Sequence, residues 1–383
     1  MLVHLFISLP FVVCTVWFVS LLLDYISEPT DIRRRLMVFM FTAALLYVGH
    51  MAYFSHETEN FIYADAMYAA CNLAVYPLYL IYIMQLTEGR IRRLMWLSLL
   101  PATIFGIGYA ACYTMMSRGE ISSFVQTYLY EGTTIGLTGK ALMISKVHNV
   151  AKIVFGLMVI ITLVRGSMLL RKFSHRIQSY YADTEGRTLK PISILLILFV
   201  ITSVLSTIAN ILGREQFYEN KVFIAIPSLL FSSLLFGIGY IGSRQMFSHI
   251  DFEQDRANEA ESEPGTTDEL EILSKMEELA QRIEWLMQEE HFFQQPNLKI
   301  SDMARRLGTN SKYISQAINQ VLGEPFADYV NNYRIRYAKE LHQQHPDLPI
   351  SEVAHRSGYL SMQSFYRNLK SRGGNLLLIK ADN

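Results

Sequence analysis

The chain has 383 residues, of which 51% are hydrophobic and only 18% charged, with basic and acidic side chains in equal number. That length allows two or three domains, and that composition argues against a protein that is soluble throughout. All three cysteines lie in apolar runs, which favours buried thiols over disulfides or metal ligands.

Seven apolar runs fill residues 1–243 and predict a seven-transmembrane-helix bundle. Each run is about as long as the hydrocarbon core of a bilayer requires, and soluble core helices are rarely so long and apolar on every face. No Lys or Arg precedes Arg33, so the first run lacks the basic start of a signal peptide and is expected to be a retained span. The runs are residues 2–23, 36–54, 63–86, 94–113, 147–170, 191–212 and 222–242.

Basic residues predict how the bundle is oriented, because cytoplasmic connections between spans are enriched in Lys and Arg. The first, third and fifth connections carry basic clusters, such as residues 33–35, whereas the second connection carries none. We therefore expect the odd connections and the C-terminus in the cytoplasm and the N-terminus outside.

Polar side chains interrupt the apolar runs, toward the outer half of the bilayer in this orientation. Such groups are costly in lipid and usually face a bundle interior or a cavity, so they could form a ligand site that opens to the outside. The alternative is that they join helices or lie at the interface. Asp65 and Lys152, of opposite charge and similar depth, could pair. The candidate cluster is Asp65, Asn72, His148, Asn149, Lys152 and Asn210.

Tyrosines crowd the third run. Those near its ends suit an interfacial belt, while an aromatic pocket wall is the other interpretation. They are Tyr63, Tyr68, Tyr76, Tyr79 and Tyr82.

The segment that follows the bundle is strongly acidic. Residues 244–267 are polar with a Pro-Gly break and predict a linker. Residues 268–290 predict a helix with a short coiled-coil-like apolar seam. Either this helix packs on the next domain or it forms a homodimer, and both interpretations stay open. The seam residues are Ile272, Met276, Leu279, Ile283 and Leu286.

The C-terminal domain, residues 291–374, has 11 basic and 6 acidic side chains, an excess of positive charge that suits nucleic acid. It contains two units of short helix, glycine-containing break and second helix, with breaks at residues 308–310 and 357–359. This is the helix-turn-helix pattern, and it occurs twice. A helix over residues 325–344 would join the units and span about 30 Å. Successive major-groove faces lie roughly 34 Å apart, so both units could read one duplex.

These residues resemble the DNA-binding domain of the AraC/XylS family of bacterial transcription regulators, over roughly 80 residues. The resemblance rests on ISDMARRLGTNSKYISQAIN, YVNNYRIRYAKEL and ISEVAHRSGYLSMQSFYRNLK. It implies double-stranded promoter DNA as a partner, RNA polymerase as a candidate partner, and a structural pairing for Arg334 within the domain. Two departures stand out. Leu369 replaces the usual Phe, and the tail at residues 375–383 reads NLLLIKADN where the family has Thr-Pro or Ser-Pro and a Tyr-Arg pair.

The second helix of each unit carries the candidate DNA-binding residues. Gln and Asn can pair with adenine edges, and Lys can reach phosphate or guanine. Ile314, Ala317 and Ile318 are expected to pack inward. An ordinary polar helix face is the alternative for any single residue. The candidates, which are expected to be exposed, are Ser311, Lys312, Tyr313, Gln316 and Asn319 in the first unit and Ser361, Met362, Gln363, Ser364 and Arg367 in the second.

No motif indicates an enzyme, a cofactor or a metal site. GIGYIG matches a dinucleotide-binding string, but it lies inside an apolar run with no preceding strand. The sequence thus predicts an all-α, multi-pass regulator of the bacterial inner membrane that binds promoter DNA and receives an unknown small-molecule or membrane signal. A membrane enzyme or transporter with a DNA-binding reporter domain is the alternative. A third hypothesis is a tether from which proteolysis releases the regulator.

Overall fold

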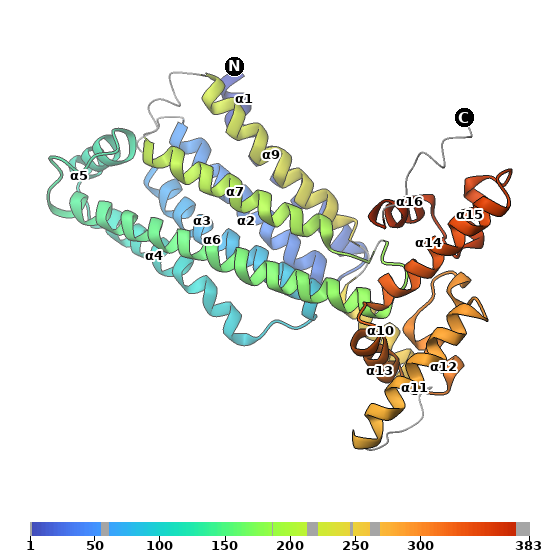
Figure 1. The fold of residues 1–383 in the computed structure, drawn as a ribbon. Coiled ribbons are helices and arrows are strands. Elements are labelled where there is room, and N and C mark those ends of the chain that lie inside the picture. Colours follow the sequence, from blue (N-terminus) through green and yellow to red (C-terminus); the bar gives the residue numbers. More distant parts are fainter. Residues whose placement is uncertain are drawn as a thin grey trace. The chain divides into compact units, whose positions relative to one another are not determined.

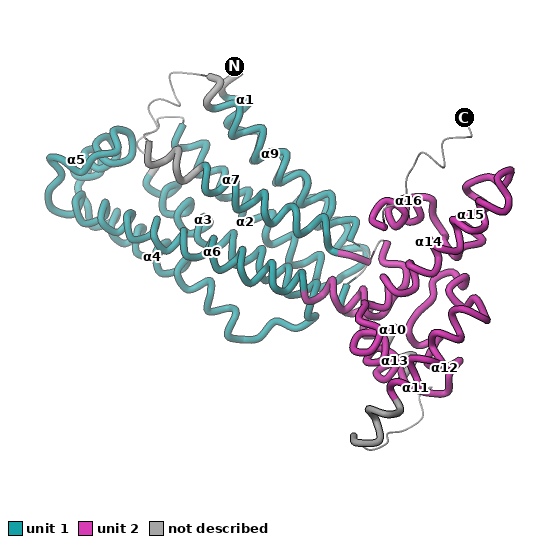
Figure 2. The backbone as a smooth tube through the Cα atoms, in the orientation of Figure 1, with its two compact units in different colours: residues 1–171, 189–249 teal, residues 172–188, 250–383 magenta. Residues whose placement is uncertain are grey.

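The structure is a computed structural model, and it describes residues 2–54, 61–185, 187–212, 221–245, 248–260 and 269–372. Within these ranges all regular elements are helices, and Tyr181 forms an isolated antiparallel bridge with Lys299. The predicted all-α class is confirmed. The chain folds as two compact units: Met1–Arg171 with Leu189–His249, and Lys172–Thr188 with Ile250–Asn383 (Figure 2).

Helices of the first unit coincide with the predicted apolar runs. The main departure is α6, whose 42 residues make it about 63 Å long, roughly twice the thickness of a bilayer core. The elements are α1 (Leu2–Ser27), α2 (Asp31–Phe54), α3 (Phe61–Glu88), the 3-10 helix η1 (Arg93–Leu99), α4 (Leu100–Thr114), α6 (Gly139–Tyr180), α7 (Lys190–Leu212) and α9 (Lys221–Ser243) (Figure 1).

By length and hydropathy, six helices among the described residues can cross a membrane. In the part of α7 whose side chains are described, Lys190–Leu205 counts as a shorter apolar helix, so the seven-span count stays a prediction. An apolar stripe on α6 is more than half exposed at Ile153, Leu157 and Ile160. Exposed apolar surface of this extent is compatible with contact to lipid.

The connection between α4 and α6 is folded, which the sequence did not predict. It contains α5 (Arg118–Ser123) and a π-helix, η2 (Phe124–Tyr130). The Ser117 hydroxyl accepts a hydrogen bond from the Glu120 amide, and the Glu120 carboxylate accepts one from the Ser117 amide, which caps α5. The η2 segment then buries aromatic side chains in a core shared with α3, α4 and α6.

The second unit contains the C-terminal helices. Its first helix, α10 (His249–Ala260), lies inside the predicted linker, where Phe252 is buried against the rings of Tyr180 and Tyr181. The others are α11 (Glu269–Gln288), the 3-10 helix η3 (Phe292–Gln294), α12 (Ile300–Leu307), α13 (Ser311–Gln316), the π-helix η4 (Ala317–Val321), α14 (Phe326–Gln344), α15 (Ile350–Arg356) and α16 (Met362–Ser371).

Helix α11 packs within the second unit against α12, α13, η3 and η4. Met276, Leu279, Ile283 and Leu286 of the predicted seam are each at most 8% exposed there. The first of the two open interpretations, packing on the DNA-binding domain, is therefore the observed one. The same side chains are not available for a dimer seam in this conformation.

Candidate DNA-binding interface

The first helix-turn-helix is formed by α12 and α13. Gly308 ends α12 in the left-handed region at φ 66°, a conformation that favours glycine. The Asn310 side chain accepts a hydrogen bond from the Tyr313 amide at 2.9 Å and so caps α13. The predicted inward set, Ile314, Ala317 and Ile318, is completely buried, which confirms which face of this helix packs on the domain.

The second helix-turn-helix is formed by α15 and α16. The turn passes through Gly358 at φ 88°, and the Ser361 hydroxyl caps α16 by accepting from the Ser364 amide at 3.1 Å. A Cβ atom on Gly358 would lie 2.7 Å from the Phe293 carbonyl oxygen and 2.9 Å from that of Gln294. The backbone therefore needs glycine here for both its dihedral angle and its lack of a side chain.

Helix α14 joins the two helix-turn-helix motifs and carries a buried arginine. Its 19 residues make it about 28 Å long, near the predicted span. Arg334 is 1% exposed and donates to the carbonyl oxygens of Phe293 and Gln295, at 2.7 Å each. Its guanidinium also lies 5.4 Å from the Tyr359 ring, and burial lowers its pKa. The structural role that the resemblance implied for Arg334 agrees with this geometry.

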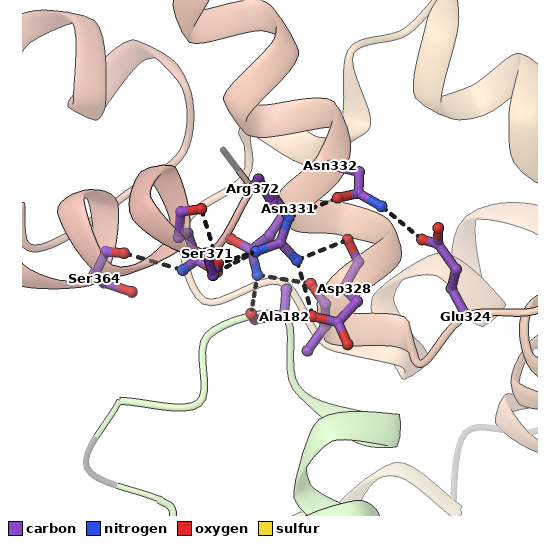
Figure 3. Close-up of polar contacts among 10 residues, drawn as sticks. Ala182, Glu324, Asp328, Asn331, Asn332, Ser364, Ser371 and Arg372 are labelled. Carbon is purple, nitrogen blue, oxygen red and sulfur yellow. Dashed lines mark hydrogen bonds and ion pairs between the residues drawn. The ribbon is translucent and has the colours of Figure 1, made fainter. Parts of the chain in front are cut away.

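The end of α16 is fastened to α14 by Arg372 (Figure 3). Its guanidinium donates to the Asp328 carboxylate at 2.9 Å and to the Asn332 amide oxygen at 2.6 Å. It also donates to the Asn368 amide oxygen at 2.8 Å. Leu369 is 3% exposed in a core shared by α14, α15 and α16. The second helix-turn-helix is thus closed by contacts within the described residues, and the atypical tail at 375–383 lies outside them.

The candidate DNA-binding residues differ in exposure. Lys312, Gln363 and Arg367 are exposed, whereas Ser364 is only 1% exposed, so its predicted exposure is wrong. The Asn319 amide, in η4, donates to the Ser315 carbonyl, in α13, at 2.8 Å. The remaining candidates are partly exposed: Ser311, Tyr313, Gln316, Ser361 and Met362.

Residues 181–185, which we call the cover loop, contact Ser361 and Ser364. This segment lies between α6 and α7 in the chain, yet it folds into the second unit. The Ser361 hydroxyl donates to the Glu185 carboxylate at 2.5 Å, and the Ser364 hydroxyl donates to the Asp183 carboxylate at 3.2 Å. No local pattern in the sequence indicates this contact, because the partners are some 180 residues apart.

The polar residues of the first unit form a buried cluster around His148. The Asp65 carboxylate accepts from the Tyr113 hydroxyl at 2.7 Å and lies 3.1 Å from Nε2 of His148, whose Nδ1 lies 3.0 Å from the Ile144 carbonyl oxygen. These contacts join α3, α4 and α6 through one set of buried polar side chains.

The other polar candidates of the first unit lie beside this cluster or outside the described side chains. The Asn149 side-chain oxygen accepts from the Tyr128 hydroxyl at 2.7 Å, and Lys152 lies over the Tyr128 ring. The pairing of Asp65 with Lys152 stays a prediction. Asn210 lies in α7 among the residues whose side chains are not described.

A cavity of about 390 Å³ lies among α1, α2, α3, α6, α7 and α9 of the first unit. Tyr68, Asn72 and Tyr76 line it from one face of α3, at spacings of four residues. Among the described residues, these three side chains have no hydrogen-bond partner, and none of the lining residues is Asp, Glu, Lys or Arg. The cavity thus combines apolar walls with hydrogen-bonding side chains, and His50 also lines it.

Two helix-turn-helix units on one connecting helix define a DNA-binding domain. Residues 303–376 match the family model of a helix-turn-helix domain and are an AraC-type domain of that family. The chain is also 31% identical over 77 residues to the Bacillus subtilis (strain 168) protein named "Uncharacterized HTH-type transcriptional regulator YtdP". That match spans 20% of this chain and only 10% of the relative. No solved structure gives a significant match to the chain.

Proposed function

We propose that the chain is a membrane-anchored transcription regulator whose C-terminal domain binds promoter DNA through α13 and α16. The observation that carries the proposal is the AraC-type domain, with Lys312, Gln363 and Arg367 exposed, on the same chain as helices long and apolar enough to span a bilayer. Lys and Arg at these positions would bind phosphates, and Gln would bind base edges.

The fifth connection supports the proposed orientation. Basic residues favour a cytoplasmic location for this connection. Independently, Lys172–Thr188 folds into the same compact unit as the DNA-binding domain, which must reach DNA in the cytoplasm. Two unrelated features therefore favour the same side of the membrane for the connection and for the domain.

The cavity supports a sensing role for the first unit. Because none of the lining residues is Asp, Glu, Lys or Arg, the cavity disfavours an ionic ligand, which would lose its hydration there. The Asn72 amide and the tyrosine hydroxyls could instead orient an uncharged amphiphile of drug-like size, since pockets of this size hold such molecules. A transporter or enzyme would also need a cavity. A sensor is distinguished from these alternatives because its ligand alters DNA binding, whereas a transporter moves its ligand and an enzyme converts it.

Genome-wide crosslinking of the intact protein to DNA tests the proposal. We expect a limited set of promoter sites, with occupancy reduced by Lys312→Ala and by Arg367→Ala. The matched control is Lys339→Ala, which removes an exposed positive charge from α14 rather than from α13 or α16. Equal loss with all three substitutions would indicate general electrostatic attraction, and enrichment at no site would contradict the function.

A further inference from the structure

The cover loop is held firmly in the second unit by its first two residues. Tyr181 and Ala182 are each 1% exposed. The Ala182 amide donates to the Leu298 carbonyl at 3.0 Å, and the Ala182 carbonyl accepts from the buried Asn331 amide at 2.9 Å (Figure 3). The Tyr181 hydroxyl donates to the Asp255 carboxylate at 2.5 Å. These contacts do not involve α13 or α16, the helices that carry candidate DNA-binding residues.

The next residues of the cover loop place two carboxylates on the N-terminal turn of α16. Glu185 accepts from the hydroxyl of Ser361, which caps the helix, and Asp183 accepts from the hydroxyl of Ser364, one turn further on. Arg367 donates to that same Ser364 hydroxyl at 3.1 Å. The cover loop therefore occupies polar groups that the sequence assigns to DNA.

The chemistry of that position matches a phosphate. Free amides and the helix dipole make the N-terminus of a helix favourable for anions, and serine hydroxyls there commonly bind DNA phosphates. A carboxylate offers the same negative charge and hydrogen-bond acceptors as a phosphate oxygen. A carboxylate and a phosphate cannot occupy the same hydroxyls together.

We propose that the cover loop competes with DNA within the molecule, with Asp183 and Glu185 in the place of backbone phosphates on α16. The second helix-turn-helix can engage DNA fully only when these carboxylates leave. The proposal rests on the DNA-binding function proposed above and adds how that function is restrained.

The chain path links this restraint to the cavity. The cover loop continues directly from α6 and leads into α7, and both helices contribute cavity-lining residues: Phe155 from α6, and Phe199, Thr202 and Ser203 from α7. A ligand that changes the spacing of α6 and α7 would act on both ends of the loop. A population shift of this kind needs only a difference in ligand affinity between the covered and uncovered states.

The test uses full-length protein in lipid nanodiscs and a fluorescent 40-base-pair duplex of mixed sequence. The variant Asp183→Asn with Glu185→Gln removes both negative charges and keeps Tyr181 and Ala182. If about a tenth of the molecules are uncovered, the variant should bind about tenfold more tightly, because apparent affinity scales with the competent fraction. The matched control, Asp347→Asn, removes an exposed acidic charge from the same unit and should leave affinity within about twofold.

A second measurement follows the loop itself and does not depend on how well the double variant folds. Thr184→Cys, in a background with the three native cysteines replaced, carries an environment-sensitive dye. The dye signal should change at the same DNA concentration that saturates binding. An unchanged signal at saturation, or equal affinity of wild type and double variant, overturns the cover as a competitor. Absence of binding by every protein overturns the proposed function and the cover with it.

Discussion

Gly358 is the position where a single methyl group should damage the second helix-turn-helix most. Gly358→Ala places a Cβ in the left-handed region, which costs about 1–2 kcal/mol for an ordinary residue. The new atom would also lie 2.7 Å from the Phe293 carbonyl oxygen and 3.0 Å from Nε of Arg334, which are themselves hydrogen-bonded. Moving that backbone adds about 1–3 kcal/mol, so we expect a total loss of about 2–5 kcal/mol.

Hydrogen exchange of the intact protein, followed on peptides from α15 and α16, measures this loss locally. A loss of 3 kcal/mol should accelerate exchange by roughly a hundredfold, since each 1.4 kcal/mol is a factor of ten. Gly308→Ala is the matched control, because Gly308 has a φ of 66° but nothing within 4 Å of the added Cβ. Followed on peptides from α12 and α13, the control should lose only the free energy of the unfavourable dihedral angle. Equal acceleration in the two variants would show that the contacts around Gly358 contribute nothing.

Three further predictions concern separate sites. Gln316→Ala and Gln363→Ala should each reduce discrimination between operator and random DNA by about 1–3 kcal/mol in competition binding, whereas equal losses on both DNAs would show that neither reads a base. If Asp65 and Lys152 form a pair, Asp65→Asn and Lys152→Met should each lower membrane abundance more than the double substitution, and additive effects would contradict the pair. Arg372→Ala should lower the local stability of α16 by about 1–3 kcal/mol, measured by hydrogen exchange, with unchanged exchange as the contrary result.

Patterns within a short stretch of sequence predicted most of the helices. The apolar runs gave the positions of the first-unit helices, because a helix that faces lipid must be apolar over its whole length. The glycine breaks gave both helix-turn-helix turns, since Gly308 and Gly358 adopt dihedral angles that other residues avoid. The buried face of α13 followed from spacing alone.

Contacts between distant segments were not predicted in the same way. The pairing of Asp65 with Lys152 stays a prediction, and the contacts of the Asp65 carboxylate with His148 and Tyr113 were not predicted. The Ser364 hydroxyl donates to Asp183, and neither residue carries a local signature of the other. Such pairings depend on how helices pack, and hydrophobic periodicity specifies a face of a helix but not its partner.

An isolated C-terminal fragment separates the stabilising and the restraining roles of the cover loop. A fragment from about residue 268 contains the basic domain at residues 291–374, but it lacks residues 181–185. It should be less stable than the same domain in the full chain, because the Leu298 carbonyl loses the Ala182 amide and the site that buries Tyr181 is emptied. It should nevertheless bind DNA more tightly, because Ser361 and Ser364 are no longer bonded to carboxylates.

A synthetic peptide of residues 172–188 should weaken that binding, and the same peptide with Asp183→Asn and Glu185→Gln should not. A fragment that is less stable, binds DNA more weakly and responds to neither peptide would show that the loop only supports the domain. In that case, proteolytic release of the regulator from the membrane would not increase its DNA binding.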